Sequence, residues 1–373
     1  MKKVNLVKGM LVLLVGVVGA SCQKETQELP FETTPAITAP ADSTEAPAPA
    51  TTPAPAAAPA AAAAPAPAAP AVSATASTSA TSVGTPIGFA AMNGMTTGGK
   101  GGKTVTVSTL AALKSAAGSS SPMIIMVKGT IKGKEGITVK SNKTIIGLSG
   151  SKLDGPGLKM YNVSNIIVKN MTIVNASATD AITIKDRTHH VWIDHCTFDN
   201  PIYDGLVDIT QESDYITISW SKFSNASLTS LVGGGEGSTS DKGHLRVTYH
   251  HNYFLNTLER SPSLSFGTGH VFNNYYEHTK TYKAGQGYSI ASRMGANIYT
   301  ENNYFQSIKG APIATIGTQM GFVGGDKTNI YNNCAANKIK TKASTWRPSY
   351  SYKSKLIAAA SVPSAVKAGA GAR

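Results

Sequence analysis

The sequence predicts an all-β solenoid, a single-stranded parallel β-helix, from two observations. First, a short phrase recurs in which an apolar or β-branched residue precedes two or three polar residues and then an aromatic or apolar one. Second, no amphipathic helical pattern separates the copies. The copies start at Val168, Ile193, Ile218, Tyr249, Phe272, Thr300 and Ile330, so the sequence number advances in steps of 25, 25, 31, 23, 28 and 30. In a solenoid, residues one period apart lie about 4.8 Å apart on one face.

Residues 1–22 have the pattern of a secretory signal. Three lysines precede an apolar run from Met10 to Val18, and Gly19-Ala20-Ser21-Cys22 follows. This order is typical of a bacterial lipoprotein signal, in which Cys22 becomes the lipidated first residue; an ordinary cleaved signal with an incidental cysteine is the alternative. The apolar run is too short to span a bilayer as a helix. We therefore expect a secreted or cell-surface protein, an outer-membrane lipoprotein that contacts the membrane only through its lipid.

Residues 23–84 are predicted to be a disordered linker. They are rich in Ala, Pro, Thr and Ser and contain few large apolar residues. Such a segment cannot bury enough surface to offset the entropy of ordering it. The folded domain is therefore expected at residues 85–373.

The predicted domain opens with strands and one short helix. Residues 104–107 have strand character, and residues 109–117 form a short helix with Thr109 as its N-cap. This helix is expected to close the open end of the solenoid, which otherwise exposes an apolar face. Further strands are predicted at residues 123–128, 136–139 and 143–146. After Cys334 the pattern fades, and the tail is expected to pack along the outside.

The net charge of the domain indicates an acidic partner. Residues 1–84 hold four basic and five acidic residues, so the remaining residues carry 30 basic and 16 acidic side chains, a net charge of +14. For a secreted domain this favours a polyanion. Nucleic acid is disfavoured because no basic stretch is interleaved with aromatic residues, which leaves an acidic polysaccharide. The domain is expected to be a monomer.

Two residue types in the phrases are predicted to be structural. Cys196 and Cys334 lie five coils apart, about 24 Å, so they are expected to be unpaired core thiols. Asparagines near the middle of the phrases are expected to hydrogen-bond to one another and to the turns. They are Asn170, Asn252, Asn274, Asn303, Asn332 and Asn333.

Three acidic residues are predicted to share one face. Asp204 and Asp208 are four residues apart, on one side of an extended strand. Asp180 precedes Asp204 by nearly one coil, since its distance along the sequence is within one position of the local step of 25. Converging carboxylates repel unless something neutralises them, and hard oxygen ligands suit Ca²⁺. Pairing with neighbouring lysines or arginines explains the pattern equally well.

The same register leads to an arginine. Adding the step of 25 to Asp204 gives Thr229, and the next step of 31 gives Arg260. Arg260 is therefore expected about 10 Å away, two coils along the acidic face. It is either a counter-charge for the acids or a catalytic group facing an anionic sugar.

Several segments resemble one family. Family 1 of the polysaccharide lyases, the pectate lyases, has signature blocks similar to residues 88–102, 191–195, 204–208, 215–220, 249–253 and 269–274. The blocks occur in order, and the resemblance covers about residues 86–370.

The resemblance implies a right-handed parallel β-helix that cleaves polygalacturonate or pectin by β-elimination with Ca²⁺. It implies that Asp180, Asp204 and Asp208 are calcium ligands. It further implies that Arg260 removes the C5 proton and that Arg293 binds a substrate carboxylate. Because free arginine has a pKa above about 12, Arg260 must lose its proton before it can act as a base.

The sequence departs from the family at two cationic positions. Leu228 stands where a substrate-gripping lysine is usual, and Ser265 replaces the second arginine of Arg-x-Pro-x-x-Arg. Both losses leave two alternatives open. One is a catalytically silent β-helix that binds acidic polysaccharide, and the other is a lyase that prefers methyl-esterified pectin. His195, beside Asp194 in a phrase, is expected to be structural rather than a base.

Overall fold

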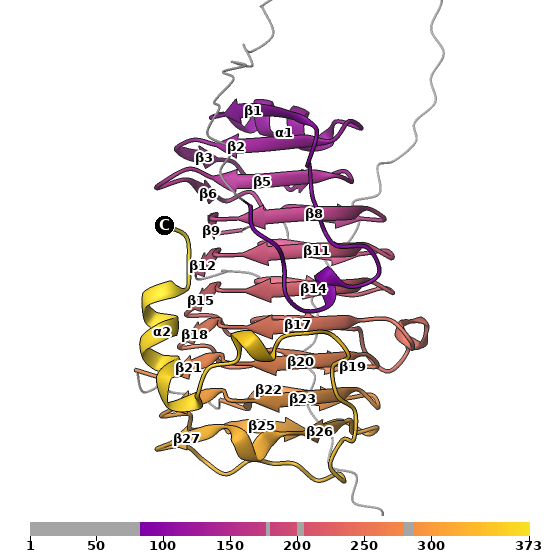
Figure 1. Cartoon of the computed structure of the whole chain (residues 1–373), viewed down its shortest axis with the longest axis vertical. Coiled ribbons are helices and arrows are strands. Elements are labelled where there is room, and N and C mark those ends of the chain that lie inside the picture. Colours follow the sequence, from indigo (N-terminus) through magenta and orange to yellow (C-terminus); the bar gives the residue numbers. More distant parts are fainter. Residues whose placement is uncertain (1–82, 177–179, 200–204, 280–285) are drawn as a thin grey trace, which may run out of the picture. The chain divides into compact units, whose positions relative to one another are not determined.

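The computed structural model describes residues 83–176, 180–199, 205–279 and 286–373. The predicted signal segment with Cys22, nearly all of the predicted linker, and Asp204 lie outside these ranges. No helix in the described ranges is long and apolar enough to cross a membrane. The described residues form a parallel β-solenoid of stacked coils, as the repeat predicts (Figure 1). Three sheets run along it, and the strands of each sheet pair in parallel with the coils before and after.

The bounds of the elements follow the three sheets. Sheet A has ten strands in the described ranges: β1 (Lys103–Val107), β2 (Met123–Val127), β5 (Lys143–Gly147), β8 (Ser164–Lys169), β11 (His189–Asp194), β14 (Asp214–Ser219), β17 (Arg246–His250), β20 (Thr268–Phe272), β23 (Asn297–Glu301) and β26 (Phe322–Gly324). Sheet B has nine there: β3 (Thr130–Lys132), β6 (Lys152–Asp154), β9 (Thr172–Val174), β12 (Thr197–Asp199), β15 (Lys222–Ser224), β18 (Tyr253–Leu255), β21 (Tyr275–Glu277), β24 (Tyr304–Gln306) and β27 (Ile330–Asn332).

Sheet C has eight strands among the same residues: β4 (Ile137–Thr138), β7 (Leu158–Tyr161), β10 (Ile182–Lys185), β13 (Val207–Ile209), β16 (Leu231–Val232), β19 (Ser263–Ser265), β22 (Tyr288–Arg293) and β25 (Ala311–Thr315). The helices are α1 (Leu110–Gly118) and α2 (Val362–Gly369), with 3₁₀ turns η1 (Phe89–Ala91), η2 (Thr239–Asp241), η3 (Asp326–Thr328), η4 (Lys353–Lys355) and η5 (Ala359–Ser361). The predicted early strands and the predicted capping helix are thereby confirmed.

The recurring phrase is the corner between sheets A and B. At this corner the backbone turns through a left-handed residue, with φ of 55° at Asn170, 50° at His195 and 56° at His251. Asn and His are enriched in this conformation, which most side chains avoid. The polar middle of each phrase therefore marks the corner, and its apolar ends mark the strands on either side.

The asparagine ladder is confirmed for Asn252, Asn274 and Asn303, whereas Asn332 and Asn333 donate to the side chains of Gln306 and Ser307 instead. Asn252 Nδ2 donates to Asn274 Oδ1 at 3.0 Å, and Asn274 Nδ2 donates to Asn303 Oδ1 at 3.0 Å. Asn303 continues to Asn329, a member that the phrases do not reveal. Asn170 instead donates to the carbonyl of Gly147, outside this ladder.

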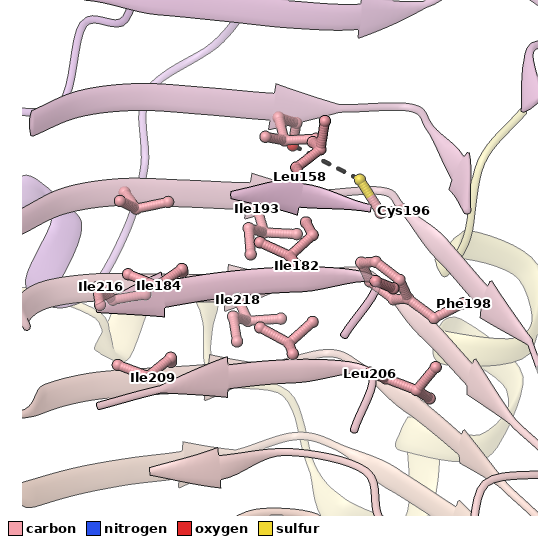
Figure 2. Close-up of a cluster of buried hydrophobic side chains, with 14 of the residues drawn as sticks. Leu158, Ile182, Ile184, Ile193, Cys196, Phe198, Leu206, Ile209, Ile216 and Ile218 are labelled. Atoms are coloured by element: carbon pink, nitrogen blue, oxygen red, sulfur yellow. Dashed lines mark hydrogen bonds between the residues drawn. The ribbon is translucent and has the colours of Figure 1, made fainter. Parts of the chain in front are cut away.

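The core fills the space between the three sheets. Isoleucine side chains from facing strands, among them Ile182, Ile193 and Ile218, meet in the interior (Figure 2). On the core side of sheet B, aromatic rings stack from coil to coil, with Phe223 and Phe254 at a centroid distance of 4.9 Å. Each coil thus buries its apolar face against the next, which is how a solenoid gains its stability.

Both ends of the described chain cover the solenoid. Helix α1 packs against the first coils through buried Leu113 and Ala117, and Thr109 Oγ1 accepts a hydrogen bond from Ala112 N at 3.2 Å. The C-terminal tail runs along the outside as predicted, and α2 lies beside β18 and β21 (Figure 1). The hydrogen bond from Ala112 N confirms Thr109 as the N-cap of α1.

Cys196 and Cys334 are unpaired, as predicted. Cys196 is fully buried in the core, and Cys334 is partly buried and packs against the same core. His195 is held in place by Asp194, whose carboxylate lies 2.7 Å from His195 Nδ1 and also contacts Lys169 and Ser219. This supports its structural role.

Candidate active site

Asp180 and Asp208 lie on neighbouring coils of sheet C. The pairing of β10 with β13 places Thr183 directly opposite Asp208. Asp180, just before β10, accepts a hydrogen bond from Thr183 Oγ1 at 2.8 Å and is 7% exposed. Both acidic side chains therefore lie alongside Thr183, and the pairing of Thr183 with Asp208 confirms the predicted step of 25 between coils at this point.

Gly205 makes room for the Asp208 carboxylate. Continued backward, the β10–β13 register places Gly205 opposite Asp180. A β-carbon on Gly205 would lie 2.5 Å from Asp208 Oδ1, so the carboxylate occupies the space that a side chain there would fill. Asp208 Oδ1 also accepts a hydrogen bond from Leu231 N at 2.9 Å. The Asp208 carboxylate is thus held over Gly205, on the coil next to Asp180.

These donors suit a hard divalent cation. Two carboxylates and a hydroxyl supply oxygen atoms, the ligands that Ca²⁺ prefers in proteins. The third predicted ligand, Asp204, precedes Gly205 but lies outside the described residues. Within the described ranges no three His, Cys, Asp or Glu side chains gather at one point. The described residues fit part of a site for such a cation.

Arg260 lies two coils beyond the coil of Gly205, and one of the two steps differs from the prediction, which was counted from Asp204, outside the described residues. The pairing of Ile209 with Val232 sets a step of 23 rather than 25, so the carbonyl of Thr229 accepts hydrogen bonds from Leu206 and Val207. The step of 31 is confirmed by the bridge between Leu228 and Glu259. The spacing differs because the phrases mark the corner between sheets A and B, whereas this step belongs to sheet C.

The backbone of Arg260 is fixed on both sides. Its carbonyl accepts a hydrogen bond from Ser230 N at 2.6 Å, and Ser261 N donates to Ser289 on the next coil at 2.7 Å. Its φ of 57° is left-handed, which is unusual for a non-glycine residue and often marks a functional position. The guanidinium is partly exposed. The backbone that carries Arg260 is therefore fixed on the coil beyond Leu228.

Arg293 ends β22, opposite Ser265 of β19. Its side chain is half-buried, and its Nε is buried without a hydrogen bond among the described residues. Ser265 is fully buried between the coils of Gly233 and Arg293. The departure at position 265 therefore concerns a buried site beside Arg293, and Arg293 is left with donor capacity for an anionic ligand.

Tyr288 lies opposite Arg260 and on the same strand as Arg293, and the repeat phrases did not reveal it. The β19–β22 register pairs Ser263 with Ala291, and the same offset places Tyr288 opposite Arg260. Burial raises the pKa of Tyr288 and Glu259 raises it further, whereas Ser263, Arg260 and Arg293 act in the opposite direction. The step of 28 between the phrases at Phe272 and Thr300, applied to Arg260, is the signal that could have found it.

Glu259 lies directly before Arg260 on the same coil. Its carboxylate lies over Gly287, in the space that a β-carbon there would occupy. Glu259 is thus placed beside Tyr288 rather than beside the acids of the preceding coils. The described face of sheet C therefore has an acidic end at Asp180 and Asp208 and a mixed end at Glu259, Arg260 and Arg293.

The described fold and sequence match known proteins. A family model described as pectate lyase matches residues 61–373. A pectate trisaccharide-lyase of Bacillus licheniformis is 38% identical over 285 residues, which cover 71% of this chain and 80% of that protein. A pectate lyase of Emericella nidulans is 43% identical over 201 residues, which cover 52% of this chain and 61% of that protein.

Solved structures agree with this match. The structure of a thermostable pectate lyase superimposes with a TM-score of 0.66 at 26% identity and covers 76% of this chain and 96% of that chain. A pectate lyase from a Bacillus species in complex with trigalacturonate gives a TM-score of 0.62 at 30% identity, covering 77% of this chain and 98% of that chain. The chain therefore belongs to the pectate lyase family of polysaccharide lyases.

Proposed function

We propose that the protein cleaves polygalacturonate by calcium-assisted β-elimination and leaves 4,5-unsaturated uronide ends. The observation that carries this is the shared face of sheet C, where Asp180 and Asp208 lie on the coils that lead to Arg260. The names of the relatives support the substrate, since one is a pectate trisaccharide-lyase and another was solved with trigalacturonate.

The acidic end would hold the metal. Asp180, Asp208 and Asp204 would bind Ca²⁺, which when bound withdraws electron density from a uronate carboxylate and makes the C5 proton more acidic. Arg293 would pair with a substrate carboxylate, because the planar guanidinium offers parallel donors to such a group.

The mixed end would move the proton. Arg260, in its neutral form, would take the proton from C5, and the electron pair left behind would form the double bond between C4 and C5. As this double bond forms, the bond from C4 to the glycosidic oxygen breaks and its electron pair leaves with the oxygen. That oxygen takes a proton from water, and the hydroxide so formed takes back the proton held by Arg260. The fixed backbone of Arg260 supports this role because proton transfer needs a base held within hydrogen-bonding distance.

Product identity tests this proposal. Purified protein is incubated with polygalacturonate and calcium, and the products are examined by NMR for the olefinic proton at C4. Elimination gives this signal, whereas hydrolysis gives saturated ends alone. Saturated products, or polymer that stays intact while it binds the protein, would contradict the proposal.

Methyl-esterified pectin is a second candidate substrate. Leu228 and Leu231 are partly exposed on the coil between Gly205 and Arg260, where an apolar surface accommodates an ester better than a carboxylate. We expect Leu228→Lys to raise the ratio of the rate on polygalacturonate to the rate on esterified pectin. An unchanged ratio would remove this candidate.

We further propose that the enzyme is tethered at the cell surface through lipid on Cys22 and a linker of residues 23–84. The proposal is supported by the signal pattern and the linker composition. Expressed in a Gram-negative host, the protein should partition into detergent and incorporate labelled fatty acid, and Cys22→Ala should do neither. Label in the Cys22→Ala protein would overturn the assignment.

A further inference from the structure

Two lysines extend the candidate site beyond its acidic end. Lys159 of β7 lies opposite Thr183 of β10, which lies opposite Asp208 of β13. Lys159 therefore stands in the same column as Asp208, two coils or about 10 Å away. Lys185, at the end of β10, lies opposite Tyr161 of β7. Both lysines are on the side of Asp208 away from Arg260.

Each lysine is held by its surroundings. The side chain of Lys159 runs over Gly136 of the preceding coil, where any β-carbon would collide with Lys159 Cε. Lys185 Nζ lies 4.4 Å from the centroid of the Tyr161 ring, a cation–π contact. Both residues are half-buried. Less conformational entropy is therefore lost when such a cation binds an anion than when a freely rotating surface lysine does.

Neither Lys159 nor Lys185 has an ion-pair partner in the described ranges. Among the described lysines four do have one: Lys114 with Glu135, Lys152 with Asp154, Lys169 with Asp194, and Lys367 with Glu277. Two immobilised cations without carboxylate partners among these residues, next to a site for a polyuronate, leave their charge available to an anionic ligand.

We propose that Lys159 and Lys185 bind carboxylates of the polyuronate chain at distal subsites. The substrate would then run along sheet C across the coils, with its reacting sugar at Arg260 and its distant, de-esterified sugars at the lysines. Lys159 and Arg260 are four coils apart, a separation of about 19 Å along the axis of the solenoid. This inference rests on the proposed function, and it adds the direction of the substrate and a preference for long, unesterified chains.

The subsites predict a dependence on substrate length. The double variant Lys159→Gln, Lys185→Gln should raise KM for long polygalacturonate about tenfold, with kcat unchanged. Its KM for trigalacturonate should not change, because a trimer placed at Arg260 does not reach the lysines. Added salt should raise the KM of the wild type more steeply than that of the variant, because two charged contacts are missing from the variant.

A matched control is Lys132→Gln, which removes an exposed lysine from sheet B. It should leave KM for both substrates unchanged, and all variants should keep the thermal midpoint of the wild type. An unchanged polymer KM in the double variant, or an equal rise for trimer and polymer, would overturn the subsites. A wild type without lyase activity would instead contradict the proposed function, so the two failures are distinguishable.

Discussion

The carboxylate of Asp208 occupies the space above Gly205, with Oδ1 2.5 Å from where a β-carbon of that residue would stand. Gly205 lies opposite Asp180 in the β10–β13 register. The missing side chain thus brings two acids of neighbouring coils toward one point. Because carboxylates so placed repel each other, the arrangement favours a bound cation.

Gly205→Ala should weaken calcium binding while the fold is kept. The added methyl group must displace the Asp208 carboxylate, so the dissociation constant for Ca²⁺ should rise at least about tenfold, or ~1.4 kcal/mol. Calorimetric titration measures this change. Gly235→Ala is the control, since a β-carbon there meets no atom within 4 Å. Equal affinities for the two variants would refute a calcium site at Asp208.

Arg260→Lys should lower kcat while KM changes little. Lysine keeps the positive charge but cannot reproduce the placement of the guanidinium, and loss of a positioned base costs about 10²–10⁴-fold. Steady-state kinetics on polygalacturonate measure the effect. A variant that retains more than half of the wild-type kcat would show that Arg260 is only a counter-charge.

Asn274→Ala should destabilise the solenoid. Asn274 is fully buried, donates to Asn303 Oδ1 and to the Tyr249 carbonyl, and accepts from Asn252. Its removal leaves buried polar groups without partners, so we expect a loss of about 3 kcal/mol in the free energy of unfolding. Asn332→Ala, on an exposed residue, should change it by less than about 0.5 kcal/mol. Urea unfolding that shows equal effects would contradict a structural role for the ladder.

Stability should fall as the pH drops below 6.5. Burial lowers the pKa of His251 from 6.5 to about 4, so between these values the unfolded chain holds a proton that the folded chain lacks. The free energy of unfolding then falls by about 1.4 kcal/mol per pH unit for this residue. Burial also lowers the pKa of His250 and of His270, which adds to the slope.

His251→Asn tests this linkage. Asparagine tolerates the φ of 56° at this corner but does not titrate. The variant loses the stacking of His251 on Trp220 at all pH values, yet its slope between pH 6.5 and 4.5 should be shallower. Urea unfolding across this range measures the slope, and one as steep as that of the wild type would be inconsistent with the neutral, buried histidine.

Most of the fold could be predicted from the sequence, because the residues at the corners between sheets A and B repeat with the period of the coils. Residues such as Asn170 and His251 adopt the left-handed conformation that follows the strands of sheet A from β8 to β23, so their spacing reports these coils directly. Strands of sheet C are also followed by left-handed residues, such as Asn162, Asp186 and Phe266, but these residues differ in type and so do not mark the coils in the sequence. The pairings of sheet C run from Thr183 to Asp208, then from Ile209 to Val232, then from Leu228 to Glu259, and these steps are unequal because the loops beside the sheet vary in length.

The site was therefore only partly predictable. The placement of Asp180 on the coil next to Asp208 follows from the regular step of 25 residues. Arg260 was reached by adding steps of 25 and 31, and the steps observed in sheet C are 23 and 31. The step of 28 could have led from Arg260 to Tyr288, which the pairing of β19 with β22 bears out, whereas Lys159 needed the pairing of β7 with β10. The use of Gly205 as space for a carboxylate depends on side-chain direction, which no repeat encodes.

The most direct test of the account is the rate of unsaturated uronide release from polygalacturonate by the wild-type protein, followed by ultraviolet absorbance. We predict steady release with calcium, loss of release when a chelator is added, and recovery when excess calcium is returned. Release that persists in chelator would contradict the calcium site. No release under any condition, with polygalacturonate still bound, would contradict the enzyme and favour a binding module.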